Sequence, residues 1–213
     1  MRTQKKHILA LIVVRLIVIT SILVSVVIIQ SSTAAFIPVI PFYYLVLLAY
    51  LMSLVFLGFY LWWKHYALQA YGQVIFDLLL ITAFVYISGG LSGSLYLLYI
   101  FVIVGASIVL SNRAAYLTAG MAAVLFGLLV DGLYFGLIPY FSPDQYRELS
   151  LGLVLFTIFL AWALFFLIAF LSSYLADNLR RAREELDFAQ RELEIKERLA
   201  TAGRLSAPLA HEI

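Results

Sequence analysis

The sequence has no cysteine and few charged residues for a chain of 213 residues. The absence of cysteine excludes disulfide bonds, thiolate metal sites and cysteine-based redox sensing. Only 12% of the residues are charged, whereas a soluble domain carries roughly a quarter. The formal net charge is +2, which gives no electrostatic case for a nucleic-acid partner.

Hydrophobic residues, by contrast, make up 64% of the chain. This composition excludes a disordered protein, because disordered chains combine low hydrophobicity with high net charge. A soluble fold of this size could not bury so much apolar surface. Lipid is the remaining solvent, so we predict an integral membrane protein.

Six apolar segments are long enough to be membrane spans. A hydrocarbon core of about 30 Å needs roughly 20 apolar residues per helix, and residues typical of turns separate the segments. The first segment is too long for a signal-peptide core, so we expect it to be retained. We therefore predict an all-α membrane protein with about six transmembrane helices, over Ile8–Ile29, Phe42–Trp63, Ala70–Ser88, Ser94–Leu110, Ala115–Leu137 and Leu149–Leu175.

The basic residues predict the orientation of these spans. Arg2, Lys5 and Lys6 precede the first span, Lys64 follows the second, and Arg113 follows the fourth. Alternating helices place these residues on one side, together with the basic residues after the sixth span. Because positive loops face the cytoplasm, we expect both termini to be cytoplasmic in a bacterial inner membrane. The short outer loops leave no external sensory domain.

Three ionisable residues fall inside the predicted spans: Arg15, Asp77 and Asp131. Such residues are costly in lipid and are candidates for function. Arg15 and Asp77 lie at comparable depth, so we expect a buried ion pair between them. Two alternatives stay open: the pair serves helix packing alone, or Arg15 extends toward the membrane surface. Asp131 is nearer the outer face, where it is a candidate for lining a polar cavity beside Tyr134 or for sensing protons.

The end of the chain has a different composition. The chain has 14 basic and 12 acidic residues, and half of this total, thirteen residues of both signs, lie from Asp177 to Arg198. Apolar residues recur in this part of the chain at alternating steps of four and three residues, and this pattern predicts a parallel dimeric coiled coil. The apolar positions are Leu175, Leu179, Ala182, Leu186, Ala189 and Leu193. A single solvated helix is the alternative. From Ile195 the pattern continues one residue out of phase, as expected where coiled-coil winding changes.

The chain closes with GRLSAPLAHEI, residues 203–213. This string resembles the H-box of sensor histidine kinases of the nitrogen-regulator-like class. The six spans with short loops resemble the six-helix sensors of PilS-type kinases, with RegB-type kinases as second choice. The resemblance implies that His211 is the phosphoacceptor and that Glu212 is the base or orienting group beside it. An imidazole suits this role, because its ordinary pKa of about 6.5 leaves it mostly neutral at cytoplasmic pH.

The resemblance also implies a domain order and partners. Residues 1–175 would be the transmembrane sensor, 176–203 the coiled-coil signalling linker, and 204–213 the start of the dimerisation and phosphotransfer helix. ATP and Mg²⁺ would bind a catalytic domain outside this chain, which would be inactive alone. A homodimer would pass the phosphoryl group to an aspartate of a response regulator. Since no external sensory domain is expected, the candidates for the stimulus are a membrane-embedded protein partner, a lipid-soluble ligand and the state of the bilayer; the sequence does not choose among them.

The sequence departs from the family pattern at two places. Pro208 stands three residues before His211, where glycine is common, and it marks either a hinge or a new helix capped by Ser206. The outer loop reads GGLSGSL over residues 89–95 and lacks the Asn-Pro-Phe of RegB-type kinases, so quinone binding is not implied.

Two other functions remain as alternatives. His211 and Glu212 could begin an HExxH zinc-protease motif whose second histidine lies beyond Ile213. A small polytopic transporter or channel could use Arg15, Asp77 and Asp131, but it would not need the coiled-coil pattern. Neither a metal site nor a cofactor site is predicted within these 213 residues.

Overall fold

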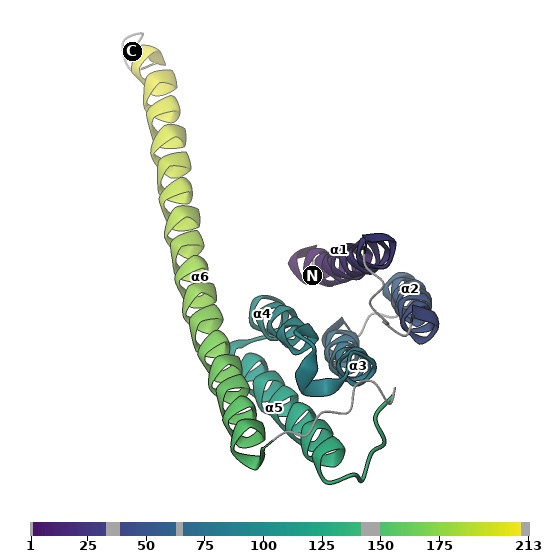
Figure 1. Cartoon of the computed structure of the whole chain (residues 1–213). Helices are drawn as coiled ribbons and strands as arrows, with labels where there is room; N and C mark the ends of the chain where they lie inside the picture. The colour runs from purple at the N-terminus through teal and green to yellow at the C-terminus, as the bar shows by residue number, and fades with distance from the viewer. Residues whose placement is uncertain (1, 33–38, 63–65, 142–149, 210–213) are drawn as a thin grey trace. The chain divides into compact units, whose positions relative to one another are not determined.

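The computed structural model describes residues 2–32, 39–62, 66–141 and 150–209, and these ranges contain helices and no strand (Figure 1). The predicted all-α class is thus confirmed for them. The α-helices are α1 (Arg2–Ser32), α2 (Val39–Trp62), α3 (Tyr66–Ile87), α4 (Tyr99–Val109), α5 (Asn112–Tyr134) and α6 (Leu151–Leu209), and two short 3₁₀ turns, η1 (Gly90–Ser92) and η2 (Leu95–Leu98), join α3 to α4.

Each of the six predicted spans corresponds to one of these helices. Within the described residues, four helices are long and apolar enough to cross a membrane, over Ile40–Trp62, Ala67–Ile87, Asn112–Tyr134 and the apolar part of Leu151–Arg198. Two shorter apolar stretches, Ile12–Ile28 and Leu95–Val109, correspond to the first and fourth predicted spans.

The fourth span differs from the prediction of one continuous α-helix. Its first turn is the 3₁₀ turn η2, and α4 itself has 11 residues. At 1.5 Å per residue α4 measures about 16 Å, which is short of a hydrocarbon core of about 30 Å. The chain before it turns sharply, because Gly89 and Gly90 have φ values of 93° and 64°, a region open to glycine at no steric cost.

The helices before residue 174 form one compact unit, Met1–Ser173. Helix α3 is its central element because it contributes to both large apolar cores. Val74, Leu78 and Val85 pack with residues of α4, α5 and α6, whereas Leu80 and Phe84 pack with residues of α1 and α2. A change in the position of α3 would therefore be felt on both sides of the unit.

Polar contacts join helices within this unit, and two of them involve α4 and α6. The hydroxyl of Tyr99 on α4 lies 2.6 Å from that of Thr82 on α3, and its ring contacts Phe165 of α6 edge to face at 5.4 Å between centroids. The indole N–H of Trp162 on α6 donates to the carbonyl of Ala123 on α5 at 2.8 Å. These bonds fix neighbouring helices where apolar packing alone has little directionality.

Residues Tyr174–Ile213 form a second unit, and α6 is continuous through this unit to Leu209. Ion pairs along the helix join Glu192 to Lys196 and Glu194 to Arg198, each at 2.8 Å. Both pairs have the i,i+4 spacing at which side chains are neighbours on the surface of a helix. The helix continues through Pro208 to Leu209, so the alternative of a new helix starting at Ser206 is wrong.

Candidate functional site

Arg15 of α1 and Asp77 of α3 form an ion pair inside the apolar spans. The guanidinium Nη2 donates to Oδ2 of Asp77 at 2.8 Å, and Nε lies 2.6 Å from Oδ1. Only 5% of the Arg15 side chain and 17% of the Asp77 side chain is exposed. The expected pairing is therefore present: one charge-assisted hydrogen bond and a second close contact join the guanidinium to the carboxylate.

Two aromatic rings complete the surroundings of the guanidinium. Its Cζ atom lies 5.2 Å from the ring centroid of Phe56 on α2 and 5.7 Å from that of Phe76 on α3. The faces of such rings attract a cation, most strongly where water is excluded. Arg15 thus contacts α2 and α3 together, so this one side chain ties the first three helices to each other.

Sequence reasoning missed two buried amides on α3, Gln69 and Gln73. Gln69 donates through Nε2 to the carbonyl of Phe56 at 2.6 Å. Gln73 is fully buried, and within the described residues neither of its side-chain polar atoms has a hydrogen-bond partner. The signal was their spacing: Gln69, Gln73 and Asp77 follow each other at steps of four, which places them on one face of the helix.

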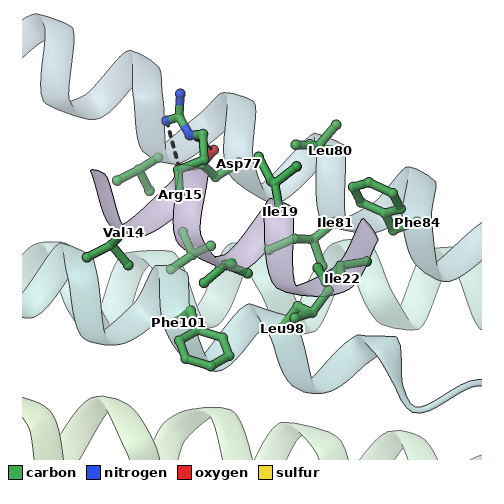
Figure 2. Close-up of a pocket in the computed structure, with 13 residues that line it drawn as sticks. Val14, Arg15, Ile19, Ile22, Asp77, Leu80, Ile81, Phe84, Leu98 and Phe101 are labelled. Atoms are coloured by element: carbon green, nitrogen blue, oxygen red, sulfur yellow. Dashed lines mark hydrogen bonds and ion pairs between the residues drawn. The ribbon is translucent and has the colours of Figure 1, made fainter. Parts of the chain in front are cut away.

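A groove adjoins the ion pair, between α1, α3 and the start of α4. Figure 2 shows Arg15 and Asp77 at one end of it and the ring of Phe84 at the other. The groove encloses about 70 Å³. Apart from the ion pair its lining is apolar, and it consists of Val14, Val18, Ile19, Ile22, Val74, Leu80, Ile81, Phe84, Leu98, Phe101 and Val102.

The other predicted site residues lie elsewhere. Asp131 is half-buried on α5, takes no part in the contacts of Arg15 and Asp77, and does not line the groove. Its predicted polar cavity beside Tyr134 is therefore not part of this site. His211 and Glu212 lie outside the described residues, so their roles stay predictions.

The site joins two helices through an ion pair and has no group suited to catalysis among the described residues. Within the described residues, no cluster of three or more His, Cys, Asp or Glu side chains could hold a metal ion. Arg15 and Asp77 neutralise each other's charge, and the buried polar groups one and two turns before Asp77 on α3 are amides, which neither attack substrates nor transfer protons readily. The ion pair can hold α1 against α3, and a change in the distance between these helices would strain or break it.

Comparison with known proteins identifies the architecture. A comparison with curated proteins and with solved structures finds no match. A family model described as the PilS-like transmembrane domain matches residues 1–186, which include all six apolar segments and the start of the charged tail. The match stops before the His-Glu pair. The chain therefore belongs to the family of PilS-like six-helix transmembrane domains, as found in PilS sensor kinases.

Proposed function

We propose that this chain is the membrane sensor and signal-transmission part of a two-component sensor histidine kinase. The observation that carries the proposal is the family match over residues 1–186, followed within 25 residues by the string LAHEI. In the proposed reaction, a ring nitrogen of His211 attacks the γ-phosphorus of ATP. A nitrogen–phosphorus bond forms, the bond to the β–γ bridging oxygen breaks, and ADP leaves with Mg²⁺. Glu212 accepts or orients the imidazole proton.

Autophosphorylation of the full-length protein in lipid nanodiscs tests this function. Labelled γ-phosphate of ATP is expected to appear on the protein and to be lost in the His211→Gln variant. The chain supplies a matched control, because His7→Gln changes another histidine outside the predicted spans and should keep the label. Acid lability of the bond distinguishes phosphohistidine from phosphoserine. Labelling that survives in His211→Gln, or that is lost equally in His7→Gln, would refute the assignment.

The proposed transmission element is the charged part of α6 as a parallel dimeric coiled coil. Support comes from the apolar seam, whose residues Leu179, Leu186 and Leu193 are exposed in the single chain and would be covered by a partner. Because the chain has no cysteine, single cysteines report pairing cleanly. Oxidation should join two copies of Leu186→Cys, whereas Glu184→Cys, on the opposite face of the helix, should stay monomeric. Equal cross-linking at both positions would contradict the seam.

The phase change near Ile195 is the proposed point of switching. Two coiled-coil registers of similar energy would form a bistable element, which a small movement of the spans could bias. Inserting one residue beside Ile195 restores the phase, so it should lock phosphorylation at one level whatever the stimulus. An unchanged response in that variant would contradict a switching role for the phase change.

We also propose that both ends of the chain face the cytoplasm of a bacterial cell. A membrane-impermeant maleimide should label Leu137→Cys, whose position is 81% exposed after α5, in intact spheroplasts. It should label Arg113→Cys, at the other end of the same helix, only after the membrane is opened. The reverse pattern would invert the proposed topology.

A further inference from the structure

Three polar residues follow one another along the same face of α3, at steps of about one helical turn. They are Gln69, Gln73 and Asp77, and this spacing places neighbouring Cβ atoms roughly 5–6 Å apart. Asp77 binds Arg15 of α1, and Gln69 donates to the carbonyl of Phe56 on α2. Gln73 lies between these two contacts, is fully buried, and has no hydrogen-bond partner within the described residues.

The unused polar atoms along this face are complementary. In the part of the chain that the structure describes, Nη1 of Arg15 is a buried donor without a partner, and Oε1 of Gln69 is a buried acceptor without one. Gln73 carries an acceptor, Oε1, and a donor, Nε2. One chain of hydrogen bonds would use all of these atoms: Arg15 donates to Gln73, Gln73 donates to Gln69, and Gln69 keeps its bond to Phe56. Because buried polar groups are normally hydrogen-bonded, Gln73 is suited to be a second acceptor for Arg15.

Phe56 of α2 contacts both ends of this polar face. Its ring centroid lies 5.2 Å from Cζ of Arg15, and its carbonyl accepts the hydrogen bond from Gln69 at 2.6 Å. The guanidinium is therefore on the side of α3 from which Gln73 can be approached. The separation that remains between Arg15 and Gln73 lies mainly along the helix, and it is at most about one turn of 5.4 Å.

Movement of α1 along α3 toward the N-terminal end of α3 would close this separation. The two helices run in the same direction, since Arg15 and Asp77 lie at one end of the groove and Ile22 and Phe84 lie toward the other (Figure 2). A displacement of less than one turn would let the guanidinium bridge Asp77 and Gln73. The ion pair would be kept, so the cost of an isolated charge in lipid would not arise.

The same movement would separate one polar contact between α1 and α2. The hydroxyl of Thr20 on α1 lies 2.7 Å from that of Tyr50 on α2. Thr20 also donates to the carbonyl of Leu16 in its own helix at 2.6 Å. It would therefore keep a hydrogen-bond partner when Tyr50 is left behind.

We infer that Arg15 has two positions on α3: the observed one at Asp77, and a second in which α1 is displaced by less than one turn and Arg15 bridges Asp77 and Gln73. Helices that shift along one another by up to one turn are a known type of switching transition. The inference rests on the proposed sensory function for its purpose, but both of its tests are made without phosphorylation. A failure of the kinase assay and a failure of these tests are therefore distinguishable.

The first test moves the carboxylate by one turn without changing the shape of any side chain. Asp77→Asn removes the partner of a buried guanidinium, so it should raise the equilibrium constant of unfolding of the full-length protein by roughly 100-fold. Adding Gln73→Glu should lower that constant again by at least about tenfold, because Arg15 can pair at the second position. Adding Gln69→Glu instead is the matched control, since it places the same carboxylate about two turns away and should restore nothing.

The second test measures the displacement by electron–electron resonance between two nitroxide labels in nanodiscs. Because the chain has no cysteine, Val24→Cys on α1 and Leu68→Cys on α3 take the labels specifically, and both positions are exposed. They lie nine residues beyond Arg15 and nine residues before Asp77, so their separation is mainly along the helix axes.

The variant with Asp77→Asn and Gln73→Glu should shorten the distance between these labels by roughly 2–5 Å, since the displacement is below one turn. Labels at Leu68→Cys and Leu128→Cys, on α3 and α5, should keep their distance. Dilution with unlabelled protein removes distances between copies of the chain.

Three results would overturn the inference. No recovery of stability with Gln73→Glu would mean that Arg15 does not reach the position of Gln73. Equal recovery with Gln69→Glu would mean that the carboxylate acts through its charge alone and not through a contact at one position. Recovery without a change in the distance between α1 and α3 would mean that the side chain reaches Gln73 by itself, which refutes the displacement.

Discussion

Removing one partner of the Arg15–Asp77 pair is expected to destabilise the protein more than removing both. Both side chains are largely buried, so a single neutral substitution leaves the other as an uncompensated charge, at a cost of about 3–5 kcal/mol. We expect Asp77→Asn to lower the free energy of unfolding by the smaller figure, because Phe56 and Phe76 still face the guanidinium. The double variant Arg15→Met with Asp77→Leu should lose less than about 1 kcal/mol, since apolar residues of similar volume often replace such pairs at no cost.

Unfolding by dodecyl sulfate in detergent micelles, followed by near-ultraviolet circular dichroism, measures these differences. Asp131→Asn is the matched control, because Asp131 is half-buried in a span but has no part in the pair; a loss below about 1 kcal/mol is expected there. Equal losses for Asp77→Asn and Asp131→Asn would refute the reasoning. A double variant as unstable as the sum of its single variants would do the same, because it would show no coupling between Arg15 and Asp77.

Three further substitutions test the packing around the site by the same unfolding assay. Gly90→Ala should cost about 1 kcal/mol more than Gly136→Ala. Both glycines have positive φ, but a Cβ at Gly90 would lie 2.7 Å from the terminal carbon Cδ1 of Leu133, which must turn away, whereas the space at Gly136 is open. Equal losses would contradict the clash. Tyr99→Phe should cost about 1 kcal/mol, because the hydroxyl bond to Thr82 is lost while the ring stays packed, and no loss would mean that the bond is not made in the micelle. Trp162→Phe should cost about 0.5–1.5 kcal/mol through its bond to α5, and an accompanying shift of the α5 backbone signals in nuclear magnetic resonance should be confined to that contact.

Two polar residues of the site were predicted from the sequence and two were missed, and the two kinds differ in charge. Arg15 and Asp77 are charged, and a charge in an apolar run is visible in the letters because its cost in lipid is large. Gln69 and Gln73 are neutral and lie near the predicted start of the third span, where polar residues are common at a membrane surface. Both are buried, and Gln69 donates to the carbonyl of Phe56 on α2; a contact with another helix is not contained in the pattern of a single helix.

The backbone at the start of the fourth span was also not predictable from the pattern of a single helix. Its residues are apolar enough for a helix, and the sequence predicted one from Ser94 onward. The observed 3₁₀ turn at Leu95–Leu98 follows the two positive-φ glycines, and Gly90 is held against Leu133 of α5. The direction in which the chain re-enters the unit is thus decided by contacts with a distant helix.

The sequence by itself determined that this protein lies in a membrane, that its domain is all-α and that a charged helix follows the last span, and it predicted a pair between Arg15 and Asp77. All four follow from one-dimensional quantities: the length of apolar runs, the cost of an isolated charge in lipid, and the period of apolar residues. Only the tertiary structure decided that α3 belongs to both cores, that Gln73 is fully buried one helical turn before Asp77, and that residues of α1, α3 and α4 line a groove next to the ion pair. These features depend on side chains from three helices meeting in space, and packing of that kind is a property of the whole assembly of helices.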